Sequence, residues 1–231
     1  MSPWLSIPAG FAPSLLWIWL VHRHDDHERE PVLLVLAALL LGGLSALAVL
    51  YVRPMVEGVW SPDVLADAFV VTALGEESFK LLAFLPLLCH RELDEPLDGV
   101  VYGAAVALGF AGVENALYAT WTDSLGVVVQ RAFTATLMHA GCTAAVGYAL
   151  AGWKLDLQRP RCWRKALRRL GLLLAAVLLH GAYDWFLLVE RPSVPMALLV
   201  VLPVTLALFA AVLRWGRHVS PEYHPPHPPG S

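Results

Sequence analysis

Charged residues are scarce in this chain: they make up 15% of its 231 residues, whereas hydrophobic residues make up 58%. Soluble globular domains carry about 25% charged residues, so this composition excludes an ordinary soluble protein and favours a membrane protein. The formal net charge is only -3, and no basic footprint indicates a nucleic-acid partner. Cysteines are also few, which excludes a dense disulfide framework, and we expect Cys89, Cys142 and Cys162 to be free thiols.

Long apolar runs divide the chain into candidate membrane spans, because about 20 apolar residues cross the hydrocarbon core as a helix. The first run is the weakest, since Pro8 and Pro13 interrupt it, and six spans remain an alternative; we interpret it as a retained helix. Ser61 is expected to cap the third span. The sequence therefore predicts an all-α polytopic bundle of about seven membrane helices, at 5–21, 32–52, 63–89, 98–120, 126–152, 169–189 and 194–213.

The loop over residues 154–169 sets the predicted orientation, because basic loops stay in the cytosol. Seven basic residues lie in it: Lys154, Arg159, Arg161, Arg164, Lys165, Arg168 and Arg169. With seven spans, the N-terminus is then outside and the C-terminus is cytosolic. We predict one integral-membrane domain over 1–218, with a catalytic core at about 61–190, and a disordered cytosolic tail rich in proline and histidine over 219–231.

Ionisable residues inside the predicted spans are the most informative feature of the sequence. Such groups cost several kcal/mol in hydrocarbon, about 2.5–3.5 kcal/mol by insertion scales, so they normally face the bundle interior and mark a site. Their positions place them in the central or outer part of the bilayer, and spacings of three or four residues put neighbours on one helical face. We therefore predict one polar cavity lined by Glu76, Glu77, Lys80, Glu114, His139, His180 and Asp184.

The residue types in this cluster suit the activation of water. Two adjacent carboxyls in a dry site do not easily both ionise, so one of Glu76 and Glu77 can act as a base while Lys80 stabilises the ionised member. His139 and His180 can donate to a developing oxyanion or bind a metal. Asp184 can fix the tautomer of a facing histidine.

Other interpretations of the same residues remain open. The pairs Glu76/Lys80 and His180/Asp184 can be structural, each neutralised within its own helix. A proton- or ion-coupled transporter also uses such chains of ionisable groups, although the sequence lacks the inverted repeats typical of transporters. A third alternative is a silent scaffold that binds single-span partners through the glycine-rich face of the fourth span, at Gly99, Gly103, Gly109 and Gly112. We interpret these glycines first as helix-packing residues, with Gly99 and Gly103 in a GxxxG spacing.

Four motifs in order resemble the PrsW family of intramembrane proteases, distant relatives of the CAAX prenyl endopeptidases in the ABI superfamily. The motifs are EESFK (76–80), DGVVYGAAVALGFAGVEN (98–115), MHAG (138–141) and HGAYD (180–184). They cover predicted spans three to six, and they include every candidate site residue named above.

The resemblance implies an intramembrane endopeptidase in a bacterial plasma membrane that cleaves a membrane-anchored protein, with site-1 cleavage of an anti-sigma factor as the namesake activity. It implies either a metal-dependent or a glutamic, metal-free mechanism, and the local HExxH zinc signature is absent. If a zinc ion binds, we expect His139, His180 and Glu114 as its ligands.

Overall fold

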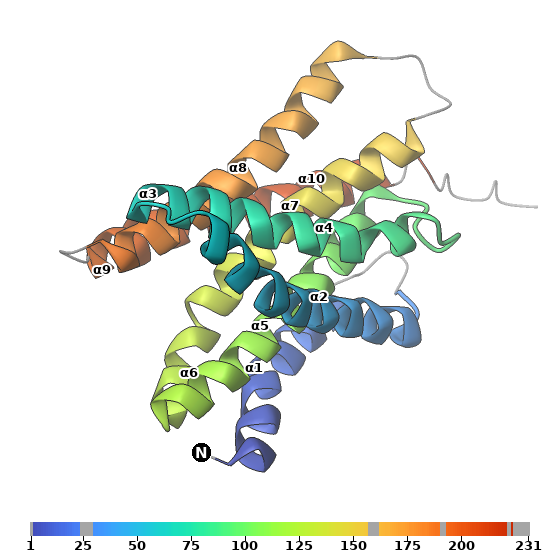
Figure 1. Cartoon of the computed structure of the whole chain (residues 1–231). Coiled ribbons are helices and arrows are strands. Elements are labelled where there is room, and N and C mark those ends of the chain that lie inside the picture. The colour runs from blue at the N-terminus through green and yellow to red at the C-terminus, as the bar shows by residue number, and fades with distance from the viewer. Residues whose placement is uncertain (1, 24–29, 157–161, 190–192, 221–222, 224–231) are drawn as a thin grey trace, which may run out of the picture.

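The computed structural model describes residues 2–23, 30–156, 162–189, 193–220 and 223. These residues contain no β-strand and form seven long helical rods (Figure 1). Two of the rods are continuous through a π-helical stretch, named η1 or η2. The rods are α1 (Pro3–Arg23), α2 (Val32–Val59), α3–η1–α4 (Val64–Ala66, Asp67–Leu74, Gly75–Leu88), α5 (Pro96–Thr122), α7 (Ala135–Leu155), α8 (Trp163–Leu188), and α9–η2–α10 (Val194–Met196, Ala197–Val201, Leu202–Val219). The short helix α6 (Leu125–Ala132) lies between α5 and α7 in the chain.

The all-α membrane bundle predicted from the sequence is confirmed. Within the described parts of the chain, five helices are long and apolar enough to cross a membrane: α1, α2, α5, α8 and the rod over 194–219. The rod over 64–88 carries the charged EESFK motif, and the chain over 125–155 is divided between α6 and α7. The count of seven spans and the orientation of the bundle therefore stay predictions.

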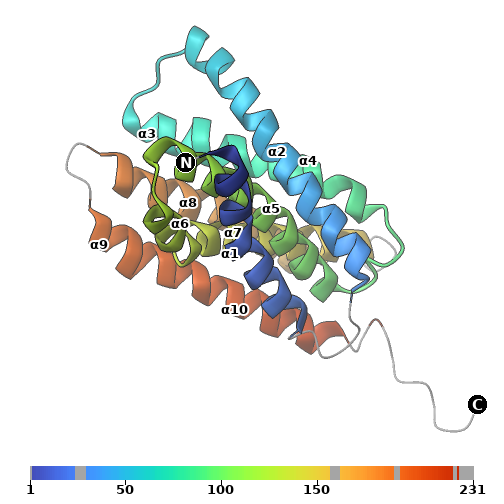
Figure 2. The ribbon, with the colours of Figure 1, turned by 90° about the horizontal axis from the view of Figure 1, so that it is seen from below.

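Helix α5 lies at the centre of the bundle, where it packs against α1, α2 and α7 (Figure 2). Some 83% of its membrane-spanning window is buried. A Cβ atom at Gly99 would lie 2.4 Å from the carbonyl oxygen of Gly147, and one at Gly103 would lie 2.6 Å from that of Thr143. Only glycine permits so close an approach of α5 and α7, so the predicted packing role of this GxxxG motif is confirmed.

Two local predictions differ from the structure. The segment 126–152 is not one helix, because Thr134 has φ −125° and ψ −92° and separates α6 from α7. The break carries no proline or glycine, so no residue type in the sequence indicates it. The N-cap of α3 is Asp63 instead of Ser61, since the Asp63 carboxylate accepts a hydrogen bond of 2.7 Å from the Ala66 amide.

The loops after α4 and α7 lie at the same end of the bundle. The Lys154 ammonium donates hydrogen bonds to the carbonyl oxygens of His90 and Leu93, at 2.8 and 2.6 Å. This is the end predicted to face the cytosol. Arg159, Arg161 and most of the predicted tail over 219–231 lie outside the described residues.

Asp156 binds two basic side chains at this end of the bundle. Its carboxylate accepts hydrogen bonds from Arg169 at 2.6 Å and from Lys165 at 3.3 Å. Partial burial raises the pKa of Asp156, but these two cations outweigh burial and hold the pKa below its ordinary value of 3.8.

All three cysteines are free thiols, as predicted. Backbone amides at the start of α8, that of Lys165 first, lower the pKa of the exposed Cys162 thiol below its ordinary 9.0.

Candidate active site

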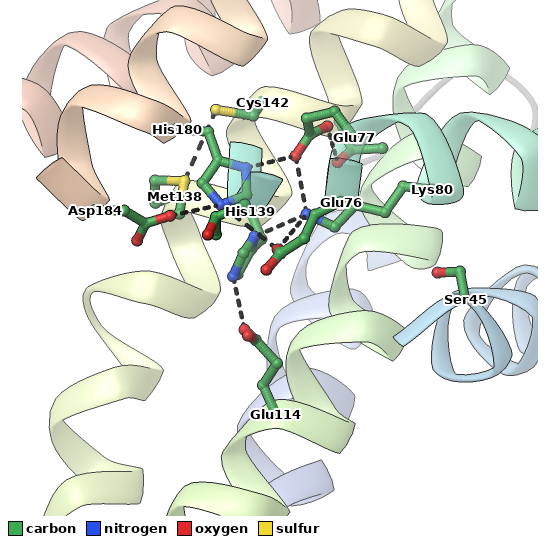
Figure 3. A network of polar contacts seen from close by, with 12 residues as sticks. Ser45, Glu76, Glu77, Lys80, Glu114, Met138, His139, Cys142, His180 and Asp184 are labelled. Carbon is green, nitrogen blue, oxygen red and sulfur yellow. Dashed lines mark hydrogen bonds and ion pairs between the residues drawn. The ribbon is translucent and has the colours of Figure 1, made fainter. Parts of the chain in front are cut away.

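The EESFK motif opens helix α4 directly after the π-helical stretch η1. Glu76, Glu77 and Lys80 are all buried, and Lys80 has no exposed surface. The Lys80 ammonium lies 2.9 Å from Glu77 Oε1 and 3.6 Å from Glu76 Oε2. The shared helical face predicted from the spacing is therefore present, with one cation serving two carboxylates (Figure 3).

Glu77 is held on both of its oxygens. Oε1 accepts from Lys80 Nζ and lies 2.9 Å from His180 Nδ1, while Oε2 accepts a hydrogen bond of 3.0 Å from the Thr143 hydroxyl. These contacts come from α4, α7 and α8, so Glu77 joins three helices at one carboxylate. Three of the roughly four lone-pair sites of Glu77 are thus used by the protein, so this carboxylate is poorly placed to accept a proton from water.

Glu76 differs from Glu77 in that one of its carboxylate oxygens accepts no hydrogen bond from the described residues. Its Oε2 is buried and has no hydrogen-bond partner among the described residues. Lys80 Nζ and His180 Nε2 each lie 3.6 Å from this oxygen. Because its neighbours lie just beyond hydrogen-bond distance, Glu76 retains an oxygen that can bind a water molecule.

His139 on α7 is held in one tautomer by its two neighbours. Its Nδ1 lies 2.9 Å from Lys80 Nζ, and because an ammonium only donates, Nδ1 is the acceptor. Its Nε2 lies 2.9 Å from Glu114 Oε2 and carries the proton that Glu114 accepts. The ring is 4.8 Å from the ring of His180, centroid to centroid, in an edge-to-face arrangement. The two histidines therefore meet although they come from different helices.

His180 and Asp184 lie one turn apart on α8. His180 Nε2 is 3.2 Å from Asp184 Oδ2, and His180 Nδ1 faces Glu77. Both ring nitrogens thus have a carboxylate neighbour, which fixes the ring orientation. The structure places Asp184 where the sequence predicted a tautomer-fixing group.

Glu114 on α5 faces His139 and is anchored by Arg131, which also contacts Asn115; neither Arg131 nor Asn115 was predicted as a site residue. Arg131 Nη2 donates to Glu114 Oε2 at 2.9 Å, and Arg131 Nε donates to Asn115 Oδ1 at 2.7 Å. Arg131 follows an apolar run at the end of α6, and its single positive charge near the predicted outer surface is a weak signal.

A cavity of about 490 Å³ connects these groups to the outside of the bundle. It lies in the half of the bundle where α2, α5 and α8 end and where α3 and α6 begin. Glu77 and Lys80 do not line it, so they lie behind the cavity wall. The site residues that do line it are Glu76, Glu114, His139, His180 and Asp184.

Asp98 and Tyr102 of the second motif lie away from this cavity. Asp98 accepts hydrogen bonds from the backbone amides of Asp94 and Glu95, at 2.9 and 2.7 Å, and forms a capping box at the start of α5. The Tyr102 hydroxyl donates to the Glu30 carboxylate. Both contacts lie in the half of the bundle opposite the cavity, so we interpret Asp98 and Tyr102 as structural residues.

Glu76, His139 and His180 form a group that can hold a metal ion, since one ligand atom from each lies within 4.8 Å of the others. Two imidazoles and a carboxylate are a common catalytic zinc set, and the open Glu76 oxygen fits that role. The carboxylate gathered here is Glu76 and not Glu114, the ligand expected from the sequence, which bonds to His139 and Arg131. Each histidine nitrogen already faces a protein group, so a bound metal would replace one of these contacts.

Comparisons with known proteins agree with the motifs. A family model described as PrsW family intramembrane metalloprotease matches residues 30–212. Proteins named Protease PrsW from Geobacillus kaustophilus and Bacillus subtilis are each 33% identical, over 90% and 78% of this chain and 89% and 82% of their own lengths. One from Oceanobacillus iheyensis is 31% identical over 78% of this chain and 82% of its own. No solved structure matched.

Proposed function

Because this chain belongs to the PrsW family of intramembrane proteases, we propose that it hydrolyses a peptide bond of a membrane-anchored protein with a water molecule activated by Glu76. The family makes it a multi-pass membrane peptidase that acts on protein. The choice of Glu76 rests on one observation: of the paired glutamates, only Glu76 lines the cavity and keeps an oxygen without a hydrogen bond.

The proposed first step is general base catalysis. The Glu76 carboxylate takes a proton from water, and the resulting hydroxide adds to the carbonyl carbon of the scissile bond. His180 Nε2 faces Glu76 across the cavity and is placed to donate to the carbonyl oxygen as it becomes negative. Glu77 and Asp184 hold the His180 ring in this orientation.

The second step returns the proton. The tetrahedral intermediate collapses, the C–N bond breaks, and the protonated Glu76 gives its proton to the leaving amine. The products are a new carboxyl terminus and a new amino terminus, and the carboxylate of Glu76 is restored. Lys80 remains behind the cavity wall, where its positive charge stabilises the carboxylates of Glu76 and Glu77.

A metal-dependent version uses the same residues differently. In it, Glu76, His139 and His180 would hold the ion. When bound, such an ion supplies Lewis-acid polarisation of a carbonyl and lowers the pKa of a bound water. Metal analysis before and after chelation, with activity measured at each stage, separates the two versions.

The cavity supports a substrate that reaches the site from the predicted outer side of the membrane. Its lining residues come from the outer halves of α2, α5 and α8 and from α6, with the site residues at its inner end. A membrane-anchored protein brings its juxtamembrane segment to this depth. The anti-sigma factors implied by the family resemblance are one such class of substrate.

A proteomic comparison tests the proposal and does not require an identified substrate. Cells that produce the wild-type chain are compared with cells that produce Glu76→Gln, and new amino termini of membrane proteins are labelled and identified. Glu92→Gln is the matched control, since Glu92 lies in the loop between α4 and α5 and forms an ion pair with exposed Arg91. We expect new termini in wild-type and control cells. The same termini in Glu76→Gln cells, at equal folded protein, would refute the assignment of the base.

A further inference from the structure

Arg131 is a largely buried cation at the end of α6, with 15% of its side chain exposed. Its guanidinium donates to Glu114 at 2.9 Å and to Asn115 at 2.7 Å, and it lies over the Tyr118 ring at 4.0 Å from the centroid. All three neighbours belong to α5. The side chain is therefore fixed in position and direction by one helix.

The break between α6 and α7 is tied to α5 on both of its sides. Before the break, Arg131 contacts Glu114 and Asn115. After it, the fully buried Asn115 amide donates a hydrogen bond of 3.0 Å to the hydroxyl of Thr136, one turn before His139. Adjacent residues of α5 thus determine where α7 begins and, through that, where the His139 ring lies.

The contacts of Arg131 extend through Glu114 to the imidazole of His139. The oxygen of Glu114 that accepts from Arg131 also accepts from His139 Nε2–H, at 2.9 Å in both cases. A carboxylate that accepts from one ring nitrogen keeps the proton there and leaves the other nitrogen as an acceptor. In this structure the accepting nitrogen is Nδ1, which faces Lys80.

We propose that Arg131 is a positioning residue that acts through Glu114 to hold His139 as its Nε2–H tautomer, with Nδ1 directed at Lys80. Without Arg131, Glu114 loses the donor that fixes its orientation, so the Nε2–H tautomer of His139 is held more weakly, by the remaining contact between Nδ1 and Lys80. The role of this arrangement in peptide hydrolysis rests on the proposed function, but the tautomer itself does not. The competing role is a direct contact with substrate, because Arg131 also lines the cavity.

The tautomer is measured by nitrogen NMR on histidine-labelled protein in lipid, after treatment with a chelator. The His139 signals are identified by their absence in His139→Gln. We expect the Nε2–H tautomer in the wild type and a mixture of tautomers in Arg131→Ala. Arg131→Lys should be intermediate, because one ammonium does not reproduce the fork that reaches both Glu114 and Asn115. The control is Arg91→Ala, an arginine whose side chain is 89% exposed.

Kinetics on a reporter cleaved by the wild type separate positioning from substrate contact. We expect kcat of Arg131→Ala to fall by about 10–100-fold with KM within about twofold, and Arg131→Lys to recover part of the loss. The loss should not add to that of Glu114→Gln, since both act on His139. An unchanged His139 tautomer in Arg131→Ala would overturn the proposal, as would a raised KM with unchanged kcat. The NMR experiment needs no substrate, so its failure is distinct from failure of the proposed function.

Discussion

Replacing Lys80 by methionine should destabilise the bundle strongly, because it leaves two buried carboxylates without their shared cation. The ammonium lies 2.9 Å from Glu77 Oε1 and 3.6 Å from Glu76 Oε2, with no exposed surface. With an effective dielectric constant of about 20, the two attractions amount to about 6 and about 5 kcal/mol. Desolvation offsets much of this, and removal of one partner from a buried ion pair typically costs about 3–5 kcal/mol.

The assay is equilibrium unfolding in mixed micelles, followed by tryptophan fluorescence. We expect Lys80→Met to lower the free energy of unfolding by about 3–5 kcal/mol. Adding Glu77→Gln should recover about 0.5–3 kcal/mol, because the neutral amide needs no cation. The control Lys165→Met removes a surface cation and should change the free energy by less than about 1 kcal/mol. A loss below about 1 kcal/mol for Lys80→Met would show that the ammonium does not hold these carboxylates.

Two further predictions concern the end of the bundle that carries Asp156. Because the folded-state pKa of Asp156 lies below 3.8, its contribution to stability is present above that pH and is lost as the pH falls through the lower folded value. Acid unfolding of Asp156→Asn should therefore lack this part of the pH dependence, and an unchanged acid profile would contradict the pairing with Arg169. Exposed Cys162 should react with a membrane-impermeant maleimide from the cytosolic side only, whereas buried Cys142 should not react in the folded protein. Labelling of Cys162 from outside would reverse the predicted orientation.

The sequence was informative where local spacing controls geometry. Glu76 and Lys80 share a helical face because they are four residues apart, and His180 and Asp184 meet for the same reason. The convergence of four helices followed from the cost of placing ionisable groups in lipid. Gly99 and Gly103 likewise predicted a close helix contact, and the structure shows that its partner is α7.

Features that depend on tertiary contacts were not predictable in this way. The choice between Glu76 and Glu77 depends on the rotation of α4, since adjacent residues on a helix point in different directions. That rotation follows the π-helical stretch before α4, which no residue type indicates. The break before α7 was not predictable for the same reason. Arg131 and Thr136 are both hydrogen-bonded to Asn115 on another helix, and local helix propensity gives no information about that contact.

Single-turnover cleavage by purified protein in lipid tests the role of Glu76 most directly. The rates of wild type, Glu76→Gln and Glu92→Gln are compared on one reporter at equal folded concentration. We predict that Glu76→Gln loses about 10²–10⁴-fold in rate, the usual contribution of a general base, while Glu92→Gln keeps the wild-type rate. Cleavage by Glu76→Gln within about twofold of the wild-type rate would contradict this role, because loss of a general base should slow the reaction by at least about 10²-fold.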